Sequence, residues 1–255
     1  MIICICLFAT VACGSLKNND YKAKELNRYA LHYFDIEQYD TALSLFWQAI
    51  AMPGVNDPMR GSIIRNLAQV YYELEQVDSA IYYSKQAAGY YDEGSFEHLI
   101  NLADVDLYSN DTRNALEKLE KAYAIDATDL SVNNALGLIY MGNYGDAFTD
   151  FKKALPYNQT AYDERQDRIS EMVLAQNYVD LGDYAAAEQH YRNIYDGYDF
   201  LAESPYYLGL VMHYQGDTLA ATQYFKETMA IDPNYRLAIP VAYLPYLDAA
   251  NPAQE

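Results

Sequence analysis

Cysteine is absent from most of this sequence. All three cysteines, Cys4, Cys6 and Cys13, fall within the first 15 of the 255 residues, and the rest of the chain contains none. A chain without pairs of cysteines along its body forms no internal disulfide framework, so its fold depends on packing alone. The same absence excludes a catalytic thiol from everything after Cys13.

Basic residues are also scarce. The chain has 17 Lys and Arg against 36 Asp and Glu, a net charge of −19. Phosphate groups repel such a surface, so nucleic acid is not an expected partner. The imbalance is strongest near the C-terminus, where 12 acidic residues from Glu171 onward stand against Arg192, Lys226 and Arg236. With 51% hydrophobic residues, the chain can still bury a packed core.

The sequence lacks recognisable catalytic and metal-binding motifs. Its histidines do not stand at metal-ligand spacing, and no HExxH pattern, nucleophile elbow or phosphate-binding glycine loop occurs. The stretch DVDLYSND at 104–111 has the spaced aspartates of a calcium loop but lacks its central glycine. We therefore expect no metal, no cofactor and no enzymatic activity.

A short apolar segment opens the chain. Residues 1–12 carry no charge, and the apolar run at 2–12 is shorter than the roughly 20 residues that a membrane-spanning helix needs. Its length fits the apolar core of a secretory signal peptide. Three residues, Thr10, Val11 and Ala12, then lead directly to Cys13.

The residues around Cys13 resemble a bacterial lipoprotein signal, in which cleavage before a cysteine is followed by lipid attachment to its thiol. This resemblance implies a signal peptide at 1–12, a lipidated Cys13 and a linker at 13–21. Gly14 follows the cysteine, where an aspartate would favour retention in the inner membrane. The resemblance thus implies an exported protein, lipid-anchored at the periplasmic face or the surface of the outer membrane. An ordinary cleaved signal with a chance cysteine is the alternative.

Six segments of similar pattern recur along the rest of the chain. Each contains an alanine, and these are Ala42, Ala80, Ala115, Ala147, Ala187 and Ala221. Four residues after each alanine stand Phe46, Ser84, Leu119, Phe151, Tyr191 and Phe225. In five segments a small residue lies twelve positions before the alanine: Ala30, Ala68, Ala103, Ala175 and Gly209. Apolar residues recur at helical spacing throughout, and Gly-Asn or Gly-Asp pairs at 142–143, 182–183 and 216–217 predict helix ends.

These columns resemble the tetratricopeptide repeat (TPR), a helix–turn–helix unit of 34 residues whose small positions let paired helices approach closely. The resemblance implies an all-α TPR superhelical solenoid of about six repeats over residues 22–235. The segment 236–255 contains Pro240 and Pro245, which exclude one long helix, and we predict that it caps the last repeat. In the fourth repeat Tyr140 lies seven residues before Ala147 instead of nine, which predicts a first helix about half a turn short.

In TPR proteins the first helix of each repeat lines the inner groove. Carried over to this sequence, the resemblance places the following residues in the groove: Leu31, Phe34, Arg65, Gln69, Tyr72, Leu107, Asn134, Leu138, Met141, Met172, Gln176, Val179, Tyr206, Leu210 and His213. Apolar and amide side chains predominate in this set. It lacks the Lys and Asn set of the TPR clamps that bind the C-terminal carboxylates of chaperones.

We therefore predict a non-catalytic TPR scaffold that binds a protein or peptide and is lipid-anchored in a bacterial envelope. The acidic C-terminal part predicts a ligand with basic flanks. Two alternatives remain open: a fixed structural subunit of an outer-membrane assembly or transport machine, and a glycan-binding module that uses tyrosines. The single tryptophan, Trp47, counts against the glycan module, since it falls in a second helix, away from the groove.

Overall fold

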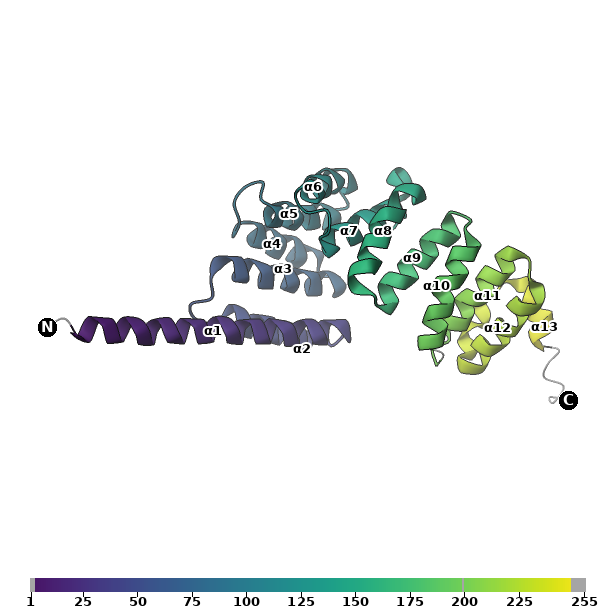
Figure 1. Ribbon diagram of the computed structural model, residues 1–255, viewed down its shortest axis with the longest axis horizontal. Helices are drawn as coiled ribbons and strands as arrows, with labels where there is room; N and C mark the ends of the chain where they lie inside the picture. The colour runs from purple at the N-terminus through teal and green to yellow at the C-terminus, as the bar shows by residue number, and fades with distance from the viewer. Residues whose placement is uncertain (1–2, 199, 249–255) are drawn as a thin grey trace. The chain divides into compact units, whose positions relative to one another are not determined.

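The computed structural model describes residues 3–198 and 200–248, and the side chains of residues 19–198 and 200–247. Within these ranges the chain forms 13 α-helices and three short 3-10 helices, and no strand. The chain divides into two compact units, residues 1–132 and 133–255. Successive helices within each unit pair into hairpins (Figure 1), which confirms the predicted all-α TPR solenoid fold.

The first unit contains three helical hairpins. The helix α1 (Ile3–Asp35) pairs with α2 (Tyr39–Ile50), α3 (Asp57–Glu73) pairs with α4 (Val77–Ala88), and α5 (Phe96–Tyr108) pairs with α6 (Thr112–Ile125). The helix α1 includes residues 13–21, for which the sequence predicted a linker, and most of the predicted signal peptide. The side chain of Cys13 lies outside the described residues. No helix in the described ranges is both long enough and apolar enough to cross a bilayer.

The second unit continues the pattern. It contains α7 (Leu130–Tyr140) from residue 133 onward and α8 (Phe151–Arg165). Two helix pairs follow, α9 (Arg168–Asp180) with α10 (Tyr184–Gly197) and α11 (Glu203–Gln215) with α12 (Thr218–Ile231). The chain then forms the 3-10 segments η2 (Pro233–Leu237) and η3 (Val241–Tyr243) and the short helix α13 (Leu244–Asp248).

The last hairpin shows why the small and large columns of the repeat belong together. A Cβ atom on Gly209 of α11 would lie 2.5 Å from Cε1 of Phe225 on α12, so the ring occupies the space that a side chain at position 209 would need. Phe225 is fully buried, as the repeat pattern predicts. Burying such a ring removes a large apolar area from water, and this drives the pairing of the two helices.

The C-terminal segment packs against this hairpin. Ile239 and Tyr243 are each 3% exposed and belong to the same buried cluster as Phe225. The Tyr243 ring meets the Phe225 ring edge to face, with centroids 4.9 Å apart. Two other apolar residues of the segment, Leu237 and Val241, remain exposed.

The fourth repeat departs from the predicted register. The helix α7 has 11 residues, against 13 in α5, α9 and α11, which agrees with the predicted loss of half a turn. Ala147, however, does not lie in the second helix, because it is exposed in a 3-10 turn, η1 (Asp146–Phe148). Gly145 adopts a φ of 97°, which stops a helix from forming there, and Asp150 caps α8 by accepting a bond from the Lys153 amide at 3.1 Å.

Ala154 and Asn158 therefore take the places that the sequence assigned to Ala147 and Phe151. Ala154 is fully buried, and a Cβ on Gly137 would lie 2.0 Å from Asn158 Oδ1, as close an approach as that of Gly209 to Phe225. Asn158 is 2% exposed, and its Nδ2 donates to Asn177 Oδ1 at 3.1 Å. Asn177 Nδ2 donates in turn to the Phe151 carbonyl at 3.0 Å. Asn158, hydrogen-bonded to Asn177 of the next hairpin, thus takes the place of the aromatic side chain.

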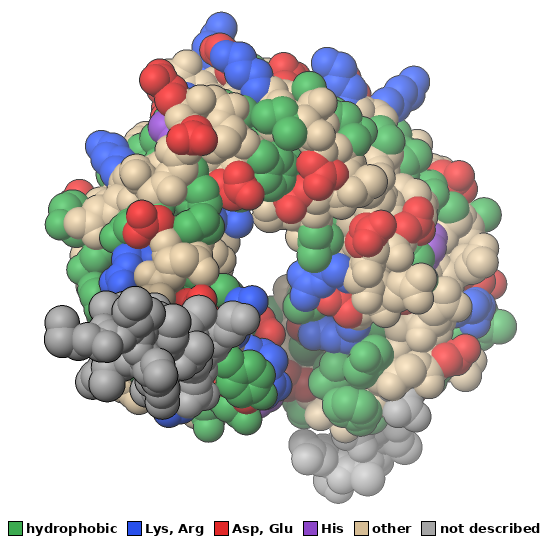
Figure 2. Space-filling view, turned by 60° about the vertical axis from the view of Figure 1, so that its left-hand side comes forward, with side chains coloured by type: hydrophobic (Ala, Val, Ile, Leu, Met, Phe, Trp, Pro, Cys, Tyr) green, Lys and Arg blue, Asp and Glu red, His purple; other side chains and the backbone are tan. Residues whose placement is uncertain are grey.

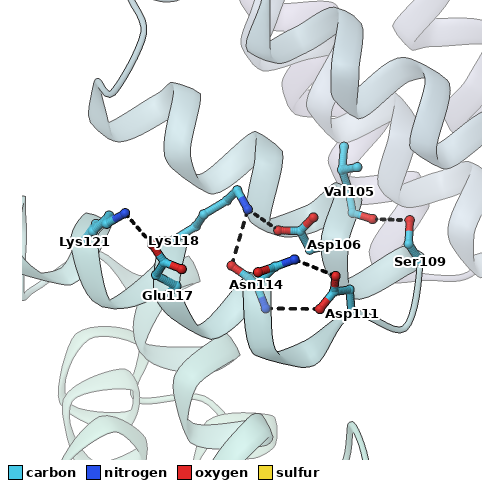
Figure 3. Close-up of polar contacts among 8 residues, drawn as sticks. All are labelled: Val105, Asp106, Ser109, Asp111, Asn114, Glu117, Lys118 and Lys121. Atoms are coloured by element: carbon cyan, nitrogen blue, oxygen red, sulfur yellow. Dashed lines mark hydrogen bonds and ion pairs between the residues drawn. The ribbon is translucent and has the colours of Figure 1, made fainter.

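In the third hairpin, the aspartates of the 104–111 stretch bind different partners, and two of these contacts are drawn in Figure 3. Lys118 of α6 donates to Asp106, which stands where TPR sequences usually have a tyrosine. Asp111 caps α6 by accepting from the Asn114 amide at 3.2 Å and from its Nδ2 at 2.7 Å. The remaining aspartate, Asp104, bonds Arg65 of α3. The three carboxylates of the 104–111 stretch therefore have three different partners.

Candidate ligand-binding surface

The predicted groove residues recur at a fixed spacing on the first helices of the repeats. Steps of four and then three residues keep each set on one side of its helix, as for Met172, Gln176 and Val179 on α9. Of the fifteen predicted residues, all except Leu107 are half-buried. We call these half-buried residues the first-helix face, and each unit has its own.

The first-helix face of the second unit is largely apolar. Met172 and Val179 of α9, together with Tyr206 and Leu210 of α11, pack against the buried cluster that contains Phe225. Their inner surfaces are therefore fixed by the core, while part of each side chain stays open to solvent. Side chains held this way lose little conformational entropy on binding, which makes them suitable anchoring points for a ligand.

Polar groups at one edge of this face link α9 to α11. Arg168 Nη1 lies 2.8 Å from Glu203 Oε2, and the guanidinium carbon is 5.9 Å from the centre of the Tyr198 ring. Both charged side chains are partly exposed, so the ion pair contributes at most about 1 kcal/mol. The contact lies at the N-terminal ends of the two helices.

The C-terminal segment orients two side chains of the same face. The Tyr206 hydroxyl donates to the Ala238 carbonyl at 3.3 Å, and His213 Nδ1 lies 3.0 Å from the Tyr243 hydroxyl. The Tyr206 phenol is a hydrogen-bond donor at neutral pH, and burial raises its pKa further above that of a free tyrosine. The segment 236–248 thus stabilises the last part of the face as well as the last hairpin.

The remaining predicted residues of the second unit contribute amides and a thioether. Gln176 Nε2 donates to Asp180 Oδ1 at 3.1 Å, and Met141 Sδ accepts from Asn158 Nδ2 at 3.2 Å. Asn134 and Leu138 of α7 are half-buried. Flexible thioethers and amides adapt to differently shaped ligands better than branched apolar side chains do.

The first-helix face of the first unit is more polar. Arg65 of α3 pairs with Asp104 of α5 at 2.8 Å, with 17% and 14% of the two side chains exposed. Burial alone would lower the pKa of Arg65, but the neighbouring carboxylate outweighs it and raises that pKa. Tyr72 stacks on Tyr108 with ring centroids 4.3 Å apart. Gln69 lies half-buried in this polar region of α3.

Toward the N-terminal side, this face becomes apolar. Leu31 and Phe34 of α1 pack against the buried cluster of the first unit. Asn66 Nδ2 donates to Asn27 Oδ1 at 3.0 Å and so links α3 to α1. Polar contacts thus join adjacent first helices in this unit.

The placement of Leu107 in the groove is wrong. Leu107 is 5% exposed and belongs to the core, while the next residue, Tyr108, turns outward because its ring stacks on Tyr72. The prediction also missed Asp104. This residue follows Ala103 just as the predicted Gln69 follows Ala68, so the sequence places both at the same position of the repeat. Its charge, opposite to that of Arg65, was the signal for the pair.

These faces carry donors, acceptors and apolar area but no set of groups arranged for catalysis. Among the described residues, no cluster of three or more His, Cys, Asp or Glu side chains is placed to hold a metal ion. The face of the second unit can bury the apolar side chains of a ligand, while that of the first unit offers charged and amide groups for hydrogen bonds.

Comparisons with known proteins identify the fold. No family model and no curated protein sequence matches the chain. Among solved structures, the APC/C hetero-tetramer Cut9–Hcn1 aligns with a TM-score of 0.63 and 19% identity, over 90% of this chain and 42% of that one. YrrB, described as a TPR protein with an unusual peptide-binding site, aligns with a TM-score of 0.56 and 18% identity, over 69% of this chain and 88% of that one.

A third structure is TTC0263, a thermophilic TPR protein in Thermus thermophilus. It aligns with a TM-score of 0.53 and 18% identity, over 68% of this chain and 90% of that one. At these identities the likeness extends to the TPR-like fold alone. The chain spans less than half the length of the Cut9–Hcn1 chain that it matches.

Proposed function

We propose that this protein is a non-catalytic scaffold that binds a protein or peptide through the first-helix face of its second unit. The observation that carries this proposal is the set of apolar side chains, among them Tyr206 and Leu210, that are fixed by the core and yet partly exposed. Aromatic and aliphatic anchors on a rigid surface supply most of the affinity in protein interfaces. The TPR-like fold, and the peptide-binding site described for YrrB, support such a use.

The charge around this face favours a ligand with Lys or Arg beside its apolar anchors. Twelve acidic residues from Glu171 onward stand against three basic ones. On the surface visible in Figure 2, acidic side chains are interspersed with hydrophobic ones. Dispersed charge of this kind mainly accelerates the encounter with an oppositely charged ligand, whereas apolar contacts slow its release.

The test is to capture a partner from the native envelope and then measure its binding kinetics. Replacing Tyr206 and Leu210 together by alanine removes two anchors, so we expect dissociation to become at least about tenfold faster, equivalent to about 1.4 kcal/mol. Raising the salt concentration should slow association and leave dissociation nearly unchanged, because exposed charges more than about 8 Å apart are screened at 0.15 M ionic strength.

The matched control removes the same two residue types elsewhere. Leu219 and Tyr246 are 82% and 55% exposed, and the double variant Leu219→Ala/Tyr246→Ala should leave both rate constants unchanged. Equal dissociation rates for the two double variants would contradict a site on the first-helix face. A partner recovered only in a fixed ratio, with unchanged kinetics in both variants, would instead favour a structural subunit of a larger assembly.

We also propose that the protein is exported and anchored by lipid on Cys13. The apolar segment at 2–12 and the small residues before Cys13 support this proposal. One acyl chain binds a membrane only marginally, whereas two or more hold a protein firmly.

Mass spectrometry of the mature N-terminus tests the anchor. The variant Cys13→Ser should lack lipid and leave the membrane fraction or accumulate as an uncleaved precursor. Cys6→Ser should change neither property, since that residue would be removed with the signal peptide. An unmodified Cys13 in the wild-type protein, or cleavage at another site, would refute the anchor without affecting the proposed binding face.

A further inference from the structure

A pocket of about 500 Å³ lies on the second helices of the last two hairpins, not on the first-helix face. Its walls come from α10 and α12, and the C-terminal end of α11 closes one side. The residues that give it chemical character are Glu188, Arg192, Tyr195, Asp217, Tyr224 and Glu227. None of them belongs to the predicted groove.

Two tyrosines form the aromatic part of the pocket. The rings of Tyr195 and Tyr224 meet edge to face, with centroids 6.0 Å apart and an interplanar angle of 79°. The Tyr195 hydroxyl donates to Glu227 Oε1 at 2.7 Å, and the Tyr224 hydroxyl accepts from Arg192 Nη1 at 3.1 Å. Both rings are therefore held in place before any ligand binds.

The net charge of the lining is negative. Three carboxylates and one guanidinium line the pocket, which leaves two negative charges over. Arg192 contacts Glu188 Oε1 through Nε at 2.9 Å and Nη2 at 2.7 Å, so this pair neutralises itself. Glu188 is ionised at neutral pH, and a hydrogen bond from Gln215 and the contact with Arg192 lower its pKa further. The excess charge therefore comes from Asp217 and Glu227.

Aromatic rings beside carboxylates attract organic cations for two reasons. The face of a tyrosine ring carries partial negative charge and attracts an ammonium or guanidinium group, and a nearby carboxylate adds Coulombic attraction and a hydrogen-bond acceptor. An anionic or purely apolar ligand would gain nothing from Asp217 and Glu227.

We propose that this pocket binds a protonated amine or guanidinium group between Tyr195, Tyr224 and the carboxylates of Asp217 and Glu227. The group comes either from a Lys or Arg side chain of a protein partner or from a free polyamine. The site is separate from the first-helix face, so a ligand can occupy it whether or not that face is filled.

The experiment titrates the ¹⁵N-labelled full chain and follows its amide spectrum. The probes are three pentapeptides, Gly-Ser-X-Ser-Gly with X as arginine, lysine or norleucine, and spermidine. We expect the arginine and lysine peptides to shift the amide signals of Tyr224 and Glu227 in a saturable way. The norleucine peptide, which has the stem without the charge, should not shift them.

Two variants remove the pocket charge with little change of shape. Glu227→Gln keeps an oxygen for the Tyr195 hydroxyl, and Asp217→Asn keeps the cap that α12 receives through the Ala220 amide at 2.9 Å. Together they should weaken binding of the charged peptides at least fivefold. The control pair Asp163→Asn/Glu164→Gln makes the same change in net charge at exposed positions of α8 and should alter binding less than twofold.

The outcomes distinguish a cation on a protein partner from a free polyamine, and both from the absence of a cation site. Saturable, variant-sensitive shifts with the charged peptides support a partner side chain, and the same behaviour with spermidine alone supports a free polyamine. Equal shifts with arginine and norleucine peptides and none with spermidine, or equal weakening by the pocket and control pairs, would overturn the site. Binding that survives Tyr206→Ala/Leu210→Ala shows that this result does not depend on the first-helix face.

Discussion

Replacing Phe225 by alanine is expected to lower the free energy of unfolding by about 3–5 kcal/mol. The Phe225 ring is fully buried, and it contacts the Tyr243 ring on one side and the backbone at Gly209 on the other. Gly209 has no side chain that could move into the space left behind, so the cavity would stay largely open. Chemical denaturation followed by circular dichroism measures the change directly.

Phe200 provides the matched control for this substitution. It is 67% exposed, so Phe200→Ala removes the same atoms without opening a cavity and should change stability by no more than about 0.5 kcal/mol. A Phe225→Ala protein as stable as Phe200→Ala would mean that the last hairpin does not pack as described. The same result would remove the evidence that Tyr243, which contacts the Phe225 ring, caps the last hairpin.

Adding a single methyl group at Gly209 should also destabilise the protein. A Cβ at this position would lie 2.5 Å from Phe225 Cε1, well inside the distance at which carbon atoms repel, so either the ring or the helices must shift. Overpacking of this kind typically costs about 1–3 kcal/mol. We expect Gly209→Ala to lower the denaturation midpoint, although alanine is the better helix former.

Gly197 tests the same substitution where there is room. No heavy atom lies within 4 Å of a Cβ built on this last residue of α10, so Gly197→Ala should be neutral or stabilise by up to about 1 kcal/mol. Opposite signs at Gly209 and Gly197 would show that steric contact, and not helix propensity, decides the outcome. A stabilising effect at both positions would refute the close approach of α11 and α12.

The repeat columns were sufficient to predict the fold. In each hairpin a small residue of one helix must meet a large residue of the other. The sequence therefore repeats these two residue types at regular intervals, and the repeat can be recognised without a structure. It correctly predicted that Phe225 is buried. The helix α7 is short as expected, but the spacing from Tyr140 to Ala147 behind that expectation does not hold, because Ala154 is the alanine that packs in this repeat. Glycine likewise predicted the helix ends at Gly182 and Gly216, where the backbone adopts positive φ.

The features that the sequence did not predict depend on tertiary packing. The turns at Glu37 and Glu75 also adopt positive φ, at 59° each, without glycine, because packing of the hairpins outweighs the local preference of the backbone. Leu107 and Tyr108 are both plausible outward residues, and only the stack of Tyr108 on Tyr72 decides between them. Ala147 and Ala154 are seven residues apart, close to two helical turns, so both have the same helical phase and periodicity could not distinguish them.

The amide pair between Asn158 of α8 and Asn177 of α9 fixes the axial alignment of these two helices from successive hairpins. Apolar side chains tolerate a small slip along the helix axis, because dispersion forces have no direction, whereas hydrogen bonds weaken steeply as their geometry changes. A slip of one residue, about 1.5 Å along the axis, would break the bond from Asn158 to Asn177 and the bond from Asn177 to the Phe151 carbonyl. Each amide left unpaired in the interior would cost about 1–3 kcal/mol. Asn158 and Asn177 therefore select one register of α8 against α9 from those that the apolar contacts alone would permit.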